Sequence, residues 1–410
     1  MKKAAVVGAG VSGLSAAHFL SDRYVVKVFE RERHPGGLIR CERVDGSLFH
    51  VCGGHVFNTR NEAVRKWFWS KFDREREFVK AERNAAVCLE DGSFVTYPIE
   101  NHVYQLGEIE QRRFVEDMLN LVSSPPSEPT NFAEFLHSRF GDMLYELYFA
   151  PYNAKVWRRN LTEVPLSWLQ GKMPMPSIAE MLSANIGRIE ERSFVHSTFW
   201  YERQNGSQLI ADRLAEGAEV VCGMDVGEIK LLEGGRCRIG DEDFDLVVYC
   251  GNLKELPMML KGVEWGSLAE MVARFESHGT TSVFCELEAN PYSWIYQPSR
   301  RHDSHRIICT GNFAASNNAK GRMTGTVEFT DEISQADIVD QLGRMPLRPR
   351  YLAHCYHRHT YPIQRQDTRE VVAAVKRLLL PHGIRLVGRF AEWEYFNMDA
   401  AIASAMGQLC

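Results

Sequence analysis

The chain begins with a short apolar run, a cluster of glycines and then a run of small residues. Ala4 to Val7 are apolar, and Gly8, Gly10 and Gly13 follow at G-x-G-x-x-G spacing. This order predicts a strand, a tight turn and a helix. Gly8 would make the turn, Gly10 would let a pyrophosphate approach the backbone, and Gly13 would let the helix pack closely on the strand. We therefore predict a dinucleotide site at this turn.

A second apolar run, Tyr24 to Phe29, ends at Glu30, 17 positions after Gly13. A carboxylate at this point can accept hydrogen bonds from an adenosine ribose. The adjacent glycines Gly36 and Gly37 follow and would let the backbone pass close to a ligand. An acid followed by Gly-Gly is typical of flavoproteins of the glutathione-reductase-like class, and NAD-only Rossmann enzymes usually lack it. The pattern therefore favours FAD over NAD.

Strand and helix patterns return far along the chain. Asp243 to Gly251 reads as a buried strand, Ile384 to Arg389 as another, and Met398 to Gln408 as a closing helix. Between the N-terminal glycine-rich unit and the closing helix, aromatic-rich helical patterns such as Asn131 to Trp168 predict a helical lobe. Alternating runs in Thr280 to Ala314 predict an antiparallel sheet.

We predict an α/β fold in which a Rossmann-like FAD-binding domain is built from several segments, with a helical lobe and an antiparallel β-sheet substrate domain. The predicted divisions are 1–100, 204–255 and 366–410 for the cofactor domain, 101–203 for the helical lobe and 256–365 for the antiparallel sheet.

Composition narrows the class of protein. The chain has 410 residues and a net charge of −5 with both signs interspersed, so a nucleic-acid partner is not expected. Ten cysteines without C-x-x-C pairs favour buried thiols in a reducing compartment.

No apolar run approaches the roughly 20 residues of a membrane span. The glycines interrupt the apolar run after Met1, against a secretory signal. We expect a cytoplasmic protein.

Three separated stretches resemble one family. Tyr152–Trp157 reads Y-N-A-K-V-W, Gly388–Asp399 begins with G-R and ends with Y-F-N-M-D, and Gly53–Phe57 reads G-G-H-V-F. Together with the glycine-rich turn and Tyr361-Pro362, they resemble, in order along nearly the whole chain, the UDP-galactopyranose mutases of the FAD-dependent amine-oxidase and glutathione-reductase-like superfamily.

This resemblance implies a non-redox isomerase that interconverts pyranose and furanose forms of a nucleotide sugar, for glycoconjugate or polysaccharide biosynthesis. N5 of the reduced flavin would attack the anomeric carbon and form a flavin–sugar adduct. The implied partners are a nucleotide-sugar substrate, NAD(P)H as reductant and a second copy of the chain in a homodimer.

The resemblance also assigns roles to residues. The catalytic residues would be His55 and Arg389. The substrate would contact Asn153, Trp157, Lys172, Tyr296, Tyr361 and Tyr395. The cofactor would contact Gly8, Gly10, Val11, Ser12, Gly13, Glu30, Arg31, Gly37, Leu38, His55, Val56, Val226, Gly388, Arg389, Asn397 and Met398.

Each role has a structural alternative. His55 could be a buried structural histidine, and Arg389 could form a structural ion pair. Asn153 and Trp157, four apart on a helix, could share an amphipathic core face. Tyr361 and other tyrosines could simply fill the core.

The chain departs from the family at the diphosphate site, which the family holds with two arginines. Lys172 stands near the first, and lysine lacks the bidentate fork of arginine. The strand expected to carry the second, Thr281–Glu288, has acids and no cation, so Arg300, Arg301 or Arg306 could replace it. The alternative function is an FAD-dependent oxidoreductase of the amine-oxidase or desaturase type.

Overall fold

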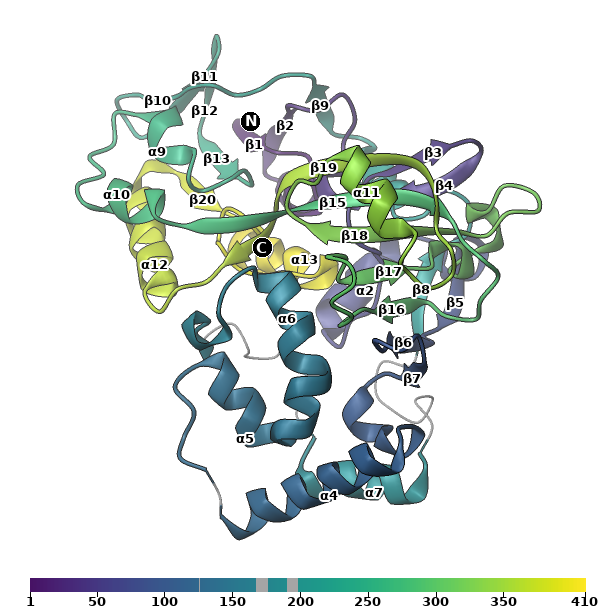
Figure 1. Ribbon diagram of the computed structural model, residues 1–410. Helices are drawn as coiled ribbons and strands as arrows, with labels where there is room; N and C mark the ends of the chain where they lie inside the picture. The colour runs from purple at the N-terminus through teal and green to yellow at the C-terminus, as the bar shows by residue number, and fades with distance from the viewer. Residues whose placement is uncertain (125, 167–175, 190–197) are drawn as a thin grey trace.

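Segments far apart in the chain meet in one parallel sheet. The computed structural model describes residues 1–124, 126–166, 176–189 and 198–410 (Figure 1). The sheet has the order β20-β13-β1-β2-β9, and all its pairings are parallel. Its strands are Ile384–Leu386, Leu246–Tyr249, Lys2–Val7, Tyr24–Glu30 and Glu219–Cys222, in that order. The predicted Rossmann-like domain assembled from several segments is therefore confirmed.

Both faces of this sheet are covered, as its apolar strands require. Successive side chains of a strand point to opposite faces, so Ala4 and Val6 pack in one core and Ala5 and Val7 in another. The first core holds α1 (Val11–Leu20), α8 (Gln208–Ala215) and α13 (Met398–Leu409). The second core holds α12 (Thr368–Leu379), α10 (Leu268–Ala273) and the small sheet β12-β11-β10-β14, whose strands are Glu242–Phe244, Cys237–Ile239, Ile229–Leu231 and Leu260–Lys261.

A seven-stranded sheet lies beside the cofactor domain (Figure 1). Its order is β19-β15-β18-β17-β16-β6-β7, and its pairings are antiparallel except for β16 with β6. The strands are Arg350–Ile363, Glu276–Glu286, Thr324–Thr330, Arg306–Ile308, Trp294–Tyr296, Ala85–Cys88 and Phe94–Thr96. The last two come from the first 100 residues, which the sequence assigned to the cofactor domain.

The helical lobe projects away from both sheets (Figure 1). It contains η2 (Ile99–Asn101), α4 (Glu108–Ser123), α5 (Phe132–Leu144), the π-helix η4 (Tyr145–Phe149), α6 (Ala150–Trp157) and α7 (Ile178–Gly187). The lobe has its own core, in which aromatic side chains of α5 and η4 pack together. After a kink at Gly141 in α5, η4 and α6 follow without a gap, and the C-terminus of α6 reaches the seven-stranded sheet.

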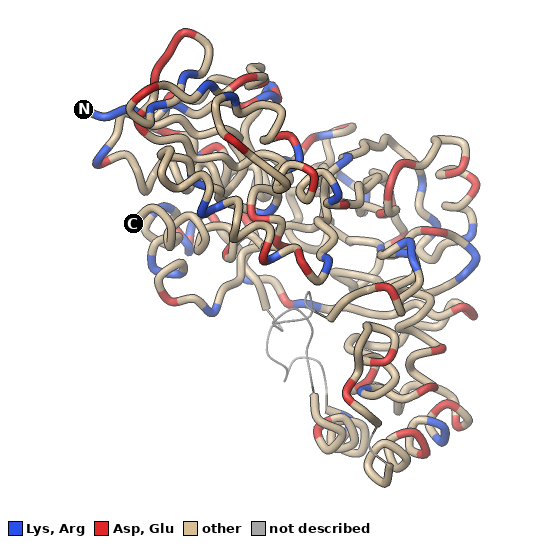
Figure 2. The backbone as a smooth tube through the Cα atoms, turned by 90° about the vertical axis from the view of Figure 1, so that its left-hand side faces the viewer, with Lys and Arg blue, Asp and Glu red and all other residues tan. Residues whose placement is uncertain are grey.

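The remaining elements connect these parts. They are β3 (Cys41–Val44), β4 (Ser47–His50), α2 (Glu62–Lys71), α3 (Arg74–Glu77), β5 (Phe78–Glu82), β8 (Thr198–Glu202), α9 (Leu256–Met259) and α11 (Gln335–Leu342). Acidic and basic residues are interspersed over the helical lobe and over the rest of the described chain (Figure 2). Within the described ranges, none of the helices combines the length and apolar character needed to cross a bilayer.

Candidate functional site

A cavity of about 280 Å³ opens at the carboxyl ends of β1, β2 and β13, the edge at which ligands bind in parallel α/β sheets. Gly8 makes the turn with a φ of +104°, and its N–H donates to the Phe29 carbonyl at 2.8 Å. A Cβ added to Gly37 would lie 3.2 Å from the Cα of Gly10. The turn at Gly37, whose φ is +54°, therefore has little room for a side chain at that position.

Gly13 acts behind the cavity. A Cβ at this position would lie 1.9 Å from the Gly8 carbonyl oxygen and 3.1 Å from Cγ1 of Val6. Only glycine lets α1 pack this closely on β1. The structure thus gives Gly13 the packing role that its spacing predicted.

Two helices of more than two turns present their N-termini to this cavity. The N-cap residues of α1 and α13 are Gly10 and Asn397, and neither cap residue has a side-chain hydrogen bond to its helix. Both residues line the cavity. Free N–H groups and the positive end of each helix dipole favour an anion or a carbonyl oxygen there.

Glu30 is held at the cavity with one oxygen toward each flanking turn. It is 6% exposed, and its Oε2 and Oε1 accept from the N–H groups of Ala9 at 2.7 Å and Glu32 at 2.9 Å. These bonds fix the carboxylate at the end of β2, where a ribose would reach it.

The structure brings most of the predicted cofactor residues together. The cavity is lined by Gly8, Gly10, Val11, Ser12, Glu30, Arg31, Gly37, Leu38, His55, Val226, Arg389, Asn397 and Met398. Three others lie outside its lining: Gly13 packs behind it, Gly388 lies against Ser12, and Val56 packs among aromatic side chains such as Phe199.

Sequence reasoning missed other residues that line the cavity. Met224 and Asp225 follow β9, and Cys250 to Asn252 follow β13. The predicted strand ending at Gly251 was a signal for the second group. His357 to His359 belong to β19 of the other sheet, and no local pattern links that strand to this cavity.

His55 is a neutral histidine with an unused ring nitrogen. Burial, with further contributions from His50 and Arg389, lowers the pKa of His55 to about 3. Its backbone N–H donates to Nδ1 of His50 at 3.3 Å, and its buried Nε2 has no hydrogen-bond partner among the described residues. A buried polar atom without a partner is costly. The lining of the cavity therefore includes a histidine whose Nε2 has no partner among the described residues.

Arg389 carries its charge to the cavity without a carboxylate partner among the described residues. Its Nε donates to the Phe396 carbonyl at 3.0 Å and its Nη1 to the Thr360 carbonyl at 3.0 Å. The guanidinium lies 4.7 Å from the ring centroid of Tyr395. The structure thus holds Arg389 by carbonyls and a cation–π contact in place of the alternative ion pair.

A second cavity of about 250 Å³ lies between the helical lobe and the seven-stranded sheet. It is lined mainly by aromatic and apolar side chains, including four predicted substrate residues, Asn153, Trp157, Tyr361 and Tyr395. Tyr361 and Tyr395 stack with ring centroids 5.5 Å apart. Because Tyr395 also contacts Arg389, the two cavities adjoin at this pair.

The other two predicted substrate residues are Tyr296 and Lys172. Tyr296 stands behind the lining: its ring packs against Tyr97 at 4.6 Å and Tyr152 at 5.6 Å, and its hydroxyl accepts from Arg83 at 3.0 Å. Lys172 lies outside the described residues.

Of the three arginines considered for the altered diphosphate site, Arg306 alone lines the second cavity. Arg301 is 61% exposed and pairs with Glu90 at 3.1 Å. Arg306 begins β17 opposite Glu328 of β18, pairs with that carboxylate through Nε, and donates from Nη2 to the Tyr361 hydroxyl at 2.9 Å. A guanidinium has five N–H donors, so donors remain for a ligand.

Glu328 joins the walls of the two cavities. It is 0% exposed, and its Oε1 accepts from the Gly53 N–H at 2.7 Å. Burial by itself would raise the pKa of Glu328, but the charge of Arg306 and the contact with His305 outweigh it and hold that pKa well below its usual range. The ionised carboxylate thus binds the Gly53–His55 turn of one cavity to the arginine of the other.

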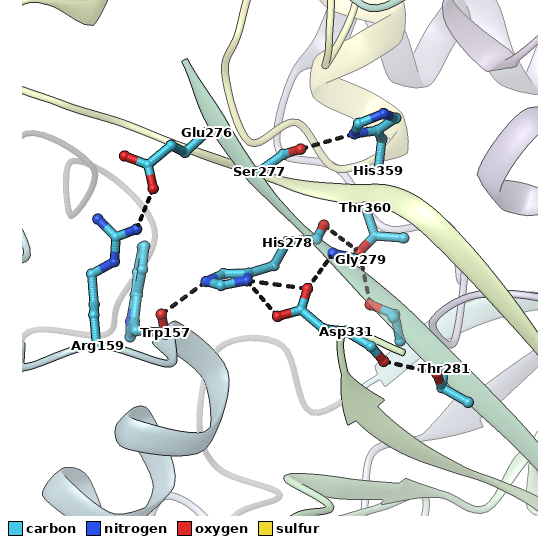
Figure 3. A network of polar contacts seen from close by, with 11 residues as sticks. Trp157, Arg159, Glu276, Ser277, His278, Gly279, Thr281, Asp331, His359 and Thr360 are labelled. Carbon is cyan, nitrogen blue, oxygen red and sulfur yellow. Dashed lines mark hydrogen bonds and ion pairs between the residues drawn. The ribbon is translucent and has the colours of Figure 1, made fainter. Parts of the chain in front are cut away.

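His278 anchors the end of α6 to β15 (Figure 3). Its Nε2 lies 2.8 Å from the Trp157 carbonyl, and its Nδ1 lies 3.0 and 3.2 Å from the two Asp331 oxygens. Both ring nitrogens thus face oxygen acceptors, one on the backbone of α6 and the other on Asp331. This contact places Trp157 and Asn153 along the second cavity.

Replacing His278 with phenylalanine is expected to lower the free energy of unfolding by about 1–3 kcal/mol, because two acceptors lose their donor. Urea denaturation at neutral pH measures this change. The control is Ser277→Ala, which removes only the partly exposed contact with His359, and its expected cost is under about 1 kcal/mol. Equal effects of the two variants would contradict the anchoring role.

Comparisons with known proteins agree with this arrangement. Residues 6–72 match the model of a NAD(P)-binding Rossmann-like domain. A curated protein named probable UDP-galactopyranose mutase, from Klebsiella pneumoniae, is 29% identical over 177 residues, which are 41% of this chain and 44% of that protein. The matched region therefore spans less than half the length of this relative.

Two solved structures extend the likeness over the whole fold. A crystal structure of reduced UDP-galactopyranose mutase has a TM-score of 0.89, with 17% identity, and covers 100% of this chain and 93% of that chain. A redesigned putrescine oxidase has a TM-score of 0.67, with 14% identity, and covers 100% of this chain and 98% of that chain. The resemblance to UDP-galactopyranose mutases is thus confirmed, and the fold is that of these flavoproteins.

Proposed function

We propose that this protein binds FAD and, with the flavin reduced, interconverts the pyranose and furanose forms of a nucleotide sugar. One observation carries the proposal: a tyrosine-rich cavity containing a held arginine adjoins a dinucleotide cavity through Tyr395 and Arg389. A sugar in the first cavity could therefore reach a flavin in the second.

The first cavity has the features that FAD requires. The glycine turns and the N-terminus of α1 would hold the pyrophosphate, and Glu30 would hold the ribose. The N-terminus of α13 would face the pyrimidine edge of the flavin, where Arg389 would favour the anionic reduced form. When bound, the reduced flavin would supply the nucleophile, N5, for an adduct with the anomeric carbon.

The second cavity has features that suit the rest of a nucleotide sugar. Arg306 and the Tyr361 hydroxyl would bind the diphosphate, and Trp157 and Asn153 would line the path of the nucleotide. Apolar walls would exclude water from a sugar that is exchanging ring forms. NAD(P)H is the proposed reductant. Because the reaction would return the flavin to its reduced state, one reduction of the flavin would serve many turnovers.

The test is incubation of dithionite-reduced protein with UDP-galactopyranose and other nucleotide sugars. Chromatography would measure the furanose isomer, and mass spectrometry after cyanoborohydride trapping would detect sugar bound to flavin. We expect product with reduced protein and almost none with oxidised protein. Absence of isomer and of trapped sugar across the panel would remove the proposal.

Arg306→Lys is expected to weaken UDP binding roughly tenfold without loss of FAD, because lysine keeps the charge but not the fork of donors. Isothermal titration of the FAD-loaded protein measures the affinity. Arg301→Lys, on the exposed pair with Glu90, is the matched control and should leave the affinity unchanged. Unchanged affinity in Arg306→Lys would place the diphosphate elsewhere.

A second candidate is a flavin oxidoreductase of the amine-oxidase type, favoured by the apolar walls of the second cavity and by the putrescine oxidase fold. It predicts that a substrate lacking a nucleotide reduces the flavin under anaerobic conditions. Flavin bleaching at 450 nm by amines, with no binding of nucleotides, would favour this candidate over the mutase.

A further inference from the structure

Glu100 is a buried carboxyl group in the wall of the second cavity. It is 4% exposed, lies in η2, and lines the cavity together with Tyr97, Tyr148 and Tyr152. The hydrogen bond found for its carboxylate is to its own backbone N–H, and no described lysine or arginine forms an ion pair with it. Burial raises the pKa of Glu100 to about 7. A carboxyl group in a cavity wall, without a cationic partner among the described residues, is available to hydrogen-bond a ligand.

Glu100 belongs to the wall formed by the helical lobe. Its carbonyl accepts from Nδ2 of Asn185 in α7 at 2.9 Å, and its neighbour Ile99 packs in the core of the lobe. Arg306 and Tyr395, by contrast, contact residues of the cofactor cavity through Glu328 and Arg389. The second cavity thus has one wall next to the dinucleotide cavity and an opposite wall formed by the helical lobe.

The covalent order of a nucleotide sugar fixes which part reaches each wall. The sugar must lie at the flavin, the diphosphate follows at Arg306, and the ribose and base extend beyond it toward the lobe. The base is then the part that meets the aromatic side chains around Glu100. This step rests on the proposed function.

We propose that Glu100 reads the nucleobase and that its preferred partner is guanine, so that the substrate class is a GDP-linked sugar. An ionised carboxylate accepts two parallel N–H bonds, and guanine presents N1–H and N2–H side by side. Uracil presents one N3–H between two carbonyl oxygens, so the second carboxylate oxygen would face an acceptor. A site built for two donors rejects a base that lacks one.

The two protonation states of Glu100 would read different bases. The ionised group suits guanine, whereas the protonated group can donate to a uracil carbonyl and accept from N3–H. Burial raises the pKa of Tyr148 and Tyr152, so both stay protonated near neutrality, and it lowers the pKa of His102, so that ring stays neutral. Asn185 of α7 and Tyr296 of β16 also lie at this wall, as does Tyr97, against whose ring the charged Arg83 packs.

GDP affinity is therefore expected to rise about tenfold between about pH 6 and pH 8, because the ionised fraction of the free protein rises across the pKa of Glu100. UDP affinity is expected to fall about tenfold over the same range. GDP and UDP carry the same diphosphate. Opposite pH dependences of their two affinities would therefore assign the effect to the base and not to the phosphates.

The experiment titrates GDP, CDP and UDP into FAD-loaded protein at both pH values by calorimetry. We expect GDP to bind at least tenfold more tightly than UDP at about pH 8. In Glu100→Gln both slopes should vanish and UDP should become the preferred ligand, since an amide can donate to a uracil carbonyl and accept from N3–H. Glu116→Gln, on the exposed side of α4, is the control and should behave as wild type.

The outcomes distinguish this inference from the proposal on which it rests. Tighter binding of UDP than GDP at both pH values, or pH slopes retained in Glu100→Gln, would overturn the role of Glu100 and leave the mutase proposal standing. Failure of all three nucleotides to bind would overturn both.

Discussion

Gly13→Ala is expected to yield protein that retains almost no FAD and unfolds at a much lower temperature. The new Cβ would lie 1.9 Å from the Gly8 carbonyl oxygen, which belongs to the backbone and cannot rotate away. Separating α1 from β1 would open the apolar core beneath Leu14 and Val6. Overpacking costs typically about 1–3 kcal/mol and more where backbone must move. Flavin absorbance per protein and the melting temperature measure the two effects.

Two further variants separate loss of folding from loss of the cofactor. A Cβ on Gly10 would meet only the Gly37 Cα, at 4.0 Å, so Gly10→Ala should fold normally but crowd a pyrophosphate and bind FAD more weakly. Gly407→Ala in α13 adds a Cβ in open space and should lose neither stability nor FAD. Full flavin content in both Gly13→Ala and Gly10→Ala would refute the dinucleotide site.

Glu328→Gln is expected to lower the free energy of unfolding by about 3–5 kcal/mol, the usual cost of breaking a buried ion pair. The change leaves the Arg306 charge without its partner and weakens the bond to the Gly53 N–H. Urea denaturation at neutral pH measures the loss. Glu90→Gln, which removes an exposed partner of Arg301, should cost less than about 1 kcal/mol.

The double variant Glu328→Gln with Arg306→Met tests the same interaction as a thermodynamic cycle. Removing both charges should cost less than the sum of the two single changes, because neither charge is then left alone. Additive losses would mean that the two side chains do not depend on each other.

The pH dependence of stability has a definite sign at Glu328. Its folded pKa is depressed, so its contribution is fully present above the unfolded value of about 4.3 and is lost as the pH falls through the folded pKa. Wild type should therefore lose stability in acid more steeply than Glu328→Gln. Parallel acid profiles would contradict a depressed pKa at this residue.

Because Glu328 contacts residues at both cavities, we expect its replacement to affect a bound flavin as well. The Gly53–His55 turn places His55 in the lining of the dinucleotide cavity, and Glu328 holds that turn through Gly53. Glu328→Gln should therefore change the flavin absorbance spectrum in addition to nucleotide affinity. Such a spectral change would distinguish a link between the cavities from a purely local stabilising role.

The sequence by itself determined the features that depend on neighbours along the chain. The spacing of Gly8, Gly10 and Gly13 after an apolar run predicted the turn, and the position of Glu30 after the second run placed a carboxylate at the end of β2. Aromatic helical patterns located the lobe. These predictions succeeded because turn geometry, helix periodicity and strand length are local properties.

Only the tertiary structure decided which distant residues share a cavity. The sequence offered three arginines without distinguishing them, and the pairing of β17 with β18 selected Arg306 by placing it opposite Glu328. Val56 was expected at the cofactor and packs elsewhere, while Glu100 carried no local signal. Cross-strand register and the docking of the lobe on the sheet set these neighbours, because burial and partner choice depend on contacts between segments far apart in the chain.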